Sequence, residues 1–117
     1  MQHHSGGCQC GAVKYEVEVD LDQTITCNCS RCQRLGSVLA FTTEDKFTLL
    51  QGEDHLTEYL FSRGVIHHLF CKVCGIESFA RGTPPKSDKF FVAINANCLD
   101  GVNPRELHSK HFDGKSV

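Results

Sequence analysis

The clearest hydrophobic pattern in the chain is a strict alternation over residues 12–19. Apolar side chains occupy every second position, and lysine or glutamate occupies the positions between them. The apolar positions are Val13, Tyr15, Val17 and Val19. Because successive side chains of a strand point to opposite faces, this pattern predicts a half-buried antiparallel β-strand.

Further short runs rich in β-branched and aromatic residues predict more strands, separated by glycine, aspartate or proline. These runs cover residues 37–42, 46–51, 56–61, 66–71, 77–81 and 89–95. Helix-compatible segments are short and lie around residues 30–36 and 97–102. Two consecutive prolines place residues 83–88 in a loop. The predicted fold class is therefore mainly β, with antiparallel sheets and short helical turns.

Length and charge narrow the possibilities. A chain of 117 residues with 40% hydrophobic residues is expected to form one domain, residues 1–117, with a modest core. The net charge of −2 and the lack of a basic stripe argue against nucleic-acid binding. No apolar segment suggests a signal peptide or a membrane span, so a soluble, cytoplasmic protein is expected. The adjacent His3 and His4 are interpreted as residues of a mobile terminus without a metal role.

The eight cysteines dominate the candidate chemistry. Disulfides are disfavoured because the expected compartment is reducing and because cysteines this close in an extended chain pair poorly. All but Cys98 fall into three motifs that suit metal binding. The motifs are Cys8-Gln9-Cys10, Cys27-Asn28-Cys29-Ser30-Arg31-Cys32 and Cys71-Lys72-Val73-Cys74-Gly75.

Each motif has a geometric reason to bind metal. The Cys71–Cys74 spacing lets two thiolates converge on one ion, and Gly75 permits the positive φ that such a turn favours. In a C-x-C pair both side chains lie on one face of an extended chain, so Cys8 and Cys10 converge after a slight bend. Cys27, Cys29 and Cys32 combine both spacings and offer three sulfurs to a single ion.

The number of cysteines in each motif predicts two zinc sites per chain, one with four protein ligands and one with three. Two motifs with two cysteines each, Cys8 and Cys10 with Cys71 and Cys74, complete a tetrahedral site that is structural because it has no vacancy. The remaining motif supplies three ligands, and an open fourth position is typical of a catalytic zinc. A zinc with three thiolates is a weak Lewis acid towards water, so we expect it to hold an incoming thiol as a nucleophilic thiolate.

Several alternatives remain open at this stage. A fourth ligand from elsewhere in the chain would make the second site structural, and iron–sulfur ligation is an alternative that the C-x-C spacings suit poorly. The candidate fourth ligands are Cys98, His67, His68, His108 and His111. In a strand, His67 and His68 point to opposite faces, so at most one can face the site. Arg31 and Arg34 are candidate partners for a carboxylate of a bound peptide-like thiol.

Taken together, the three cysteine motifs and a later segment resemble the glutathione-dependent formaldehyde-activating enzyme family, also called the centromere protein V group. The matching segments are Gly6-Gly7-Cys8-Gln9-Cys10-Gly11-Ala12-Val13, the C-x-C-x-x-C of residues 27–32, Phe70-Cys71-Lys72-Val73-Cys74-Gly75 and Asn95-Ala96-Asn97-Cys98-Leu99-Asp100. The resemblance spans nearly the whole chain and implies an Mss4-like β fold. It also implies a structural zinc on Cys8, Cys10, Cys71 and Cys74, and a catalytic zinc on Cys27, Cys29 and Cys32.

The leading functional hypothesis is a zinc-dependent enzyme with carbon–sulfur lyase activity. The resemblance implies that glutathione is the thiol and formaldehyde the aldehyde, with S-hydroxymethylglutathione as the product. The alternative is a non-catalytic, zinc-stabilised Mss4-like module that binds a protein partner through an exposed apolar patch. A nucleic-acid-binding zinc ribbon is the weakest hypothesis because no basic face is present. The sequence leaves the oligomeric state open.

Overall fold

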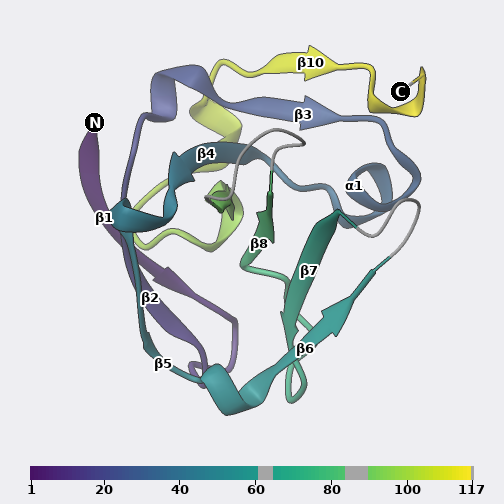
Figure 1. Ribbon diagram of the computed structural model, residues 1–117. Helices are drawn as coiled ribbons and strands as arrows, with labels where there is room; N and C mark the ends of the chain where they lie inside the picture. Colours follow the sequence, from purple (N-terminus) through teal and green to yellow (C-terminus); the bar gives the residue numbers. More distant parts are fainter. Residues whose placement is uncertain (61–64, 84–89, 117) are drawn as a thin grey trace.

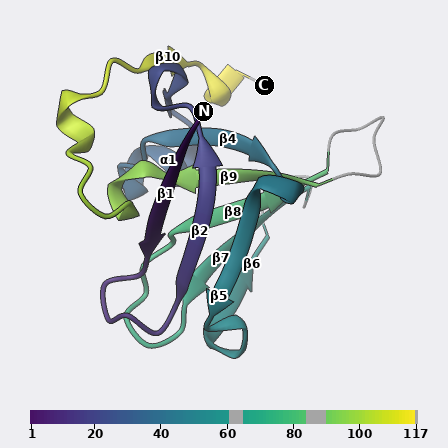
Figure 2. The same cartoon turned by 90° about the vertical axis from the view of Figure 1, so that its left-hand side faces the viewer.

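The strands form two sheets in a computed structural model that describes residues 1–60, 65–83 and 90–116. The smaller sheet has the order β1-β2-β5, all antiparallel, with β1 over Gln2–Gly7, β2 over Lys14–Val19 and β5 over Phe47–Gln51. Figure 2 shows this sheet in front of the second, larger sheet.

The larger sheet has seven strands in the order β10-β3-β4-β9-β8-β7-β6. The strands are β10 (Lys110–Phe112), β3 (Ile25–Cys27), β4 (Leu39–Thr43), β9 (Phe91–Asn95), β8 (Phe79–Gly82), β7 (Ile66–Cys71) and β6 (Leu56–Tyr59). Every pairing is antiparallel except that of β10 with β3 (Figure 1). This confirms the predicted mainly β fold class.

In the part of the chain that the structure describes, helical structure is limited to one short α-helix and several single turns. The helix α1 spans Ser30–Leu35 and ends at Gly36, which adopts a φ of 70°. This agrees with the helical segment expected at residues 30–36. The 3₁₀ turns are Leu21–Gln23, Glu44–Lys46, Glu53–His55, Ala96–Cys98, Pro104–Glu106 and Gly114–Ser116. Among the described residues, no helix is long and apolar enough to cross a membrane.

The core lies between the two sheets. On β2 the alternation holds as predicted, since Tyr15, Val17 and Val19 are at most 1% exposed. The Phe47 ring of β5 lies 5.2 Å from the Tyr15 ring and 4.8 Å from the Phe79 ring of β8. These aromatic contacts join the smaller sheet to the larger one, where burial of each ring stabilises the packing.

The structure corrects some predicted boundaries. His3 and His4, expected in a mobile terminus, lie in β1, where they pair with Glu18 and Val17 of β2. The helical turn expected at 97–102 is a 3₁₀ turn that begins one residue earlier, where Asn95 accepts a hydrogen bond from the Asn97 N–H. The strand expected at 77–81 begins only at Phe79 in β8, while the carbonyls of Glu77 and Ser78 both accept hydrogen bonds from Asn95. The predicted loop at residues 84–88, residue 61 and residue 89 lie outside the described residues.

Candidate metal centres

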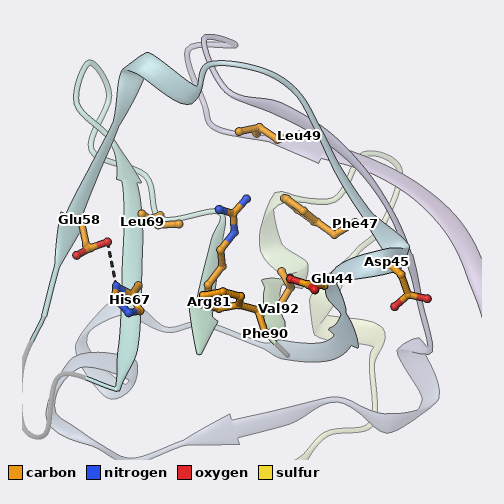
Figure 3. A pocket seen from close by; sticks show the side chains of 10 residues that line it. All are labelled: Glu44, Asp45, Phe47, Leu49, Glu58, His67, Leu69, Arg81, Phe90 and Val92. Carbon is orange, nitrogen blue, oxygen red and sulfur yellow. Dashed lines mark ion pairs between the residues drawn. The ribbon is translucent and has the colours of Figure 1, made fainter. Parts of the chain in front are cut away.

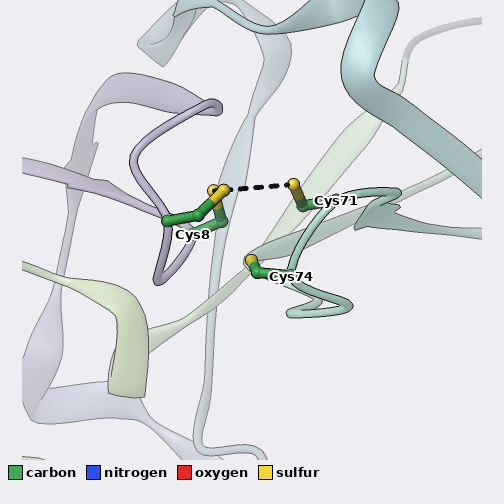
Figure 4. Close-up of side chains that lie close together, drawn as sticks. Cys8, Cys71 and Cys74 are labelled. Carbon is green, nitrogen blue, oxygen red and sulfur yellow. Dashed lines mark hydrogen bonds between the residues drawn. The ribbon is translucent and has the colours of Figure 1, made fainter.

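The first cysteine cluster joins two distant parts of the chain. Cys8 and Cys10 lie in the turn between β1 and β2, Cys71 ends β7, and Cys74 lies in the turn that follows. The four sulfur atoms all lie within 4.8 Å of one another. Cys10 Sγ is 3.6 Å from Cys8 Sγ and 3.7 Å from Cys71 Sγ. Figure 4 shows Cys8 facing Cys71 and Cys74 across the cluster. Four sulfurs at this spacing form a group that could hold a tetrahedrally coordinated ion.

Backbone geometry prepares this cluster for thiolates. The N–H of Val13 donates to Cys8 Sγ over 3.3 Å. The turn at Cys71 is closed by the Gly75 N–H, which donates to the Cys71 carbonyl over 2.7 Å, and Gly75 adopts the φ of 79° expected from the sequence. Because φ is positive there, a side chain at this position would strain the turn.

The four thiols differ in acidity because they share one small volume. Burial opposes ionisation of the Cys74 thiol, but hydrogen bonds from the Cys10 and Ile76 backbone and from neighbouring thiols lower its pKa to about 6. The Ala12 N–H favours the Cys10 thiolate, yet desolvation and the adjacent sulfurs raise the pKa of Cys10 to about 11. Crowded thiols resist losing all their protons together, and a bound cation removes that repulsion.

The second cluster lies where β3 runs into α1. Cys27 ends β3, Cys29 caps the N-terminus of α1, and Cys32 lies in its first turn. Their three sulfur atoms lie within 4.8 Å of one another. The Cys29 N–H donates to Cys27 Sγ over 3.4 Å, and the Cys32 N–H donates to Cys29 Sγ over 3.3 Å. Local backbone N–H groups therefore orient the Cys27 and Cys29 sulfurs, which lie beside that of Cys32.

The acidity of this cluster is also uneven. Burial opposes ionisation of the Cys29 thiol, but the N–H of Cys32 and the neighbouring thiols lower its pKa below the ordinary value. Burial and the Cys29 and Cys27 sulfurs raise the pKa of Cys32 to about 12. The cap position explains the difference, because only Cys29 receives the N–H groups of the first helical turn.

Within residues 1–60, 65–83 and 90–116, no further cysteine, histidine or carboxylate joins this second cluster. His67 contacts Glu58, His68 contacts Glu77, and His111 contacts Thr26. His108 is exposed. Cys98 lines a hollow together with Cys8 of the first cluster, and burial and then the charges of Cys8 and Cys74 raise the pKa of its thiol to about 11. The described part of the chain thus supplies three ligand atoms at the second cluster.

Of the two arginines beside the second cluster, Arg31 forms an ion pair with a carboxylate, whereas Arg34 donates to a backbone carbonyl. Arg31 lies 4.6 Å above the Tyr59 ring and donates to Glu77 Oε1 over 2.7 Å, whereas Arg34 donates to the Ser30 carbonyl. A hollow of about 490 Å³ adjoins them. It is lined by Ser30, Arg31, Arg34, Leu35 and Tyr59.

Glu77 was not among the residues singled out from the sequence. Its carboxylate is 7% exposed, accepts from Arg31, and lies 3.0 Å from His68 Nδ1. The one available signal was a lone glutamate just after the Cys71–Cys74 motif, in an otherwise apolar stretch. Burial of such a residue calls for charged or hydrogen-bonding partners, but the sequence does not identify them.

The C-terminal segment covers one side of the second cluster. The Asn28 N–H donates to the Phe112 carbonyl, and the Lys115 N–H donates to Asn28 Oδ1 over 2.9 Å. At Gly114 a Cβ atom would lie only 2.5 Å from Cys27 Sγ. Figure 1 shows β10 lying beside β3, which delivers this segment to the cluster. No pattern in the sequence indicates this contact.

Comparison with known proteins agrees with this architecture. A family model described as glutathione-dependent formaldehyde-activating enzyme matches residues 3–112. A crystal structure of a Rhodobacter sphaeroides protein superposes with a TM-score of 0.80 at 32% sequence identity, covering 92% of this chain and 97% of that chain. Fold and cysteine geometry define a small mainly β protein with two clusters able to hold metal ions. The chain belongs to the glutathione-dependent formaldehyde-activating enzyme family.

Proposed function

We propose that the protein is a zinc-dependent carbon–sulfur lyase that joins a thiol, glutathione or a close analogue, to an aldehyde such as formaldehyde. The thiolate sulfur bonds to the carbonyl carbon, and the carbonyl oxygen takes a proton, which gives an S-hydroxymethyl thioether; the reverse reaction releases thiol and aldehyde. Family membership supports the substrate class. The observation that carries the proposal is the second cluster with three sulfurs and no fourth ligand among the described residues.

The two clusters would hold one structural and one catalytic zinc ion. Cys8, Cys10, Cys71 and Cys74 offer a complete tetrahedral set, which suits a structural zinc between the β1–β2 turn and the end of β7. Cys27, Cys29 and Cys32 hold the catalytic zinc. When bound there, zinc supplies a positive charge that lowers the pKa of an incoming thiol.

The chain itself positions and shields this site. Backbone N–H groups of Cys29 and Cys32 donate to the sulfurs of Cys27 and Cys29, which orients these sulfurs and stabilises their thiolate form. The Arg31–Glu77 ion pair joins α1 to the segment that precedes β8. The adjoining hollow of about 490 Å³ falls within the range of ligand pockets. Arg34 at its edge is the candidate partner for a carboxylate of glutathione.

Exchange NMR tests the activity directly. Thiol and formaldehyde also combine without a catalyst, so the zinc-loaded protein must accelerate the exchange between glutathione and its S-hydroxymethyl adduct above that background. We expect Cys29→Ser to return the rate to the uncatalysed background. Cys98→Ser removes a thiol outside both clusters and serves as the matched control with an unchanged rate. Background rates with the wild-type protein, or full activity in Cys29→Ser, would contradict the proposal.

Sulfur coordination separates this enzyme from a purely structural module. X-ray absorption on the protein carrying two zinc ions gives the mean number of sulfur ligands per zinc. With an open second site, that number rises when glutathione is added. If both zinc ions already have four protein ligands, the number stays constant, and the protein is a zinc-stabilised binding module instead.

A further inference from the structure

One cavity among the described residues is separate from both cysteine clusters. It measures about 640 Å³, opens between β5 and the larger sheet, and no cysteine lines it. Its walls are mostly apolar, formed by Phe47, Leu49, Leu69, Phe90 and Val92. Figure 3 shows Arg81 in the middle of these walls, with Leu69 on one side and Phe47 on the other.

Strand register separates this cavity from the second cluster. His67 of β7 pairs with Arg81 of β8, and Arg81 pairs with Val92 of β9, so the three side chains share one face of the larger sheet. His68 points to the opposite face, where its imidazole contacts Glu77, the partner of Arg31 in α1. A ligand in the cavity therefore lies across the sheet from α1.

Arg81 is an unusual residue for such a cavity. Its guanidinium lies 5.7 Å from the Phe47 ring centroid and 5.4 Å from the Phe79 ring centroid. These two rings are its contacts, and across residues 1–60, 65–83 and 90–116 it forms no hydrogen bond or ion pair. Arg31, also partly buried, has a carboxylate partner. A partly buried guanidinium retains five N–H donors whose burial without acceptors is costly.

The surrounding charges restrict which acceptor fits. Glu58 is already paired with His67, whose Nδ1 lies 2.9 Å from its carboxylate. Glu44 and Asp45 form the opposite rim of the cavity. This rim would repel a ligand with several negative charges, such as phosphate, more strongly than a ligand with a single carboxylate.

We propose that this cavity is a second binding site, specific for a small monocarboxylate with an apolar body. The carboxylate accepts two parallel hydrogen bonds from the Arg81 guanidinium, whose planar fork matches carboxylate geometry. The apolar body packs against Leu49, Leu69 and Val92. The site is independent of the thiol chemistry assigned to the second cluster, and binding alone is claimed for it.

Phenylacetate is a suitable probe, with the neutral phenylacetamide and inorganic phosphate as comparisons. The full zinc-loaded chain is titrated with each, and binding is followed by calorimetry and by amide chemical shifts. Phenylacetate is expected to bind with a Kd of about 1 mM or tighter, as a ligand of its size allows. The shifts are expected at Phe47, Leu69, Arg81 and Val92. Phenylacetamide and phosphate are expected to bind at least about tenfold more weakly.

Substitution of Arg81 provides the decisive comparison. Arg81→Met keeps an apolar stem against Phe47 and Phe79 but removes the donors, so we expect the Kd for phenylacetate to rise at least about tenfold. Arg81→Lys keeps the positive charge but lacks the planar guanidinium, so we expect its Kd for phenylacetate to lie between those of the wild-type protein and Arg81→Met. Arg105→Met, at an exposed arginine in a 3₁₀ turn, is the matched control with unchanged binding. Circular dichroism and zinc content establish that each variant is folded.

The proposal is overturned by any of three results. Phenylacetate fails to bind, or phosphate or phenylacetamide binds as well as phenylacetate, or folded Arg81→Met and Arg81→Lys both bind it like the wild-type protein. Because thiol–aldehyde turnover at the second cluster is measured separately, failure of this site leaves the proposed function unaffected.

Discussion

Arg31 and Glu77 form an ion pair in which Arg31 Nε and Nη2 lie 3.0 and 2.7 Å from the same carboxylate oxygen. Arg31 directly precedes Cys32 of the second cluster, and Glu77 follows Cys74 of the first cluster by three residues. The other oxygen of Glu77 contacts His68 in β7. One buried carboxylate thus connects the helix of the second cluster to the segment that follows the first.

Replacement of this carboxylate is expected to destabilise the protein. Glu77→Gln keeps the size of the side chain but leaves the Arg31 guanidinium without its countercharge in a largely buried place. We expect the free energy of unfolding to fall by about 3 kcal/mol, as for other broken buried ion pairs. Denaturant unfolding in the presence of zinc measures this loss.

A neighbouring arginine supplies the control for that experiment. Arg34 is exposed and donates only to the Ser30 carbonyl. Arg34→Met is therefore expected to change the free energy of unfolding by no more than about 0.5 kcal/mol. Equal stability of Glu77→Gln and the wild-type protein would mean that the ion pair does not hold the two segments together.

The first cluster is expected to be essential for the fold. Cys71 is fully buried, and its sulfur lies within 4.8 Å of those of Cys8 and Cys10, which are distant in the sequence. Cys71→Ser should lose one zinc ion and several kcal/mol of stability, because metal binding contributes directly to folding. Elemental analysis and thermal unfolding measure both quantities. Cys98→Ser should keep its zinc content, and a stable Cys71→Ser protein with unchanged zinc would refute the structural assignment.

Local patterns in the sequence predicted the local features of this structure. The alternation at residues 12–19 predicted β2, and the cysteine spacings and Gly75 predicted the turns that bring the sulfurs together. These features depend on residues that are close in sequence. The grouping of the four cysteines of the first cluster was also predicted, because their number and pairwise spacing match a tetrahedral site.

Features set by distant contacts were missed. The segment 2–7 has no apolar alternation and two glycines, yet it forms β1 because β2 offers a complete backbone pairing edge. The three-residue strand β10 exists only through its parallel pairing with β3. Likewise, the contact of Arg31 with Glu77 depends on how α1 packs, which no local pattern encodes.

Alkaline pH is expected to destabilise the protein through Tyr15. Burial, assisted by the nearby Cys98 and Asp100 charges, raises the pKa of Tyr15 above its ordinary value. The folded state therefore keeps this phenol neutral, whereas the unfolded chain ionises it above about pH 10. The stabilisation is fully present below that pH and is lost as pH rises further, by about 1.4 kcal/mol at about pH 11.

Tyr15→Phe separates this effect from other alkaline changes. The variant loses the hydrogen bond to the Ser78 carbonyl at every pH, but its stability should fall less than that of the wild-type protein between about pH 8 and about pH 11. Tyr59→Phe, at the exposed tyrosine, is expected to retain the wild-type slope. Denaturant unfolding at both pH values measures the difference, and identical slopes for Tyr15→Phe and wild type would exclude Tyr15 as the cause.

The contact between Gly114 and the second cluster predicts that the C-terminal segment influences metal binding there. A methyl group at Gly114 would lie 2.5 Å from Cys27 Sγ, so Gly114→Ala must displace either the sulfur or the segment. We expect zinc affinity at the second cluster to fall about tenfold, as for other changes next to metal ligands, with the first cluster unaffected. Competition with a chromophoric chelator resolves the two zinc ions.

Lys115→Ala keeps the backbone N–H that donates to Asn28 and should bind both zinc ions normally. If Gly114→Ala also binds both normally, the segment does not press on Cys27.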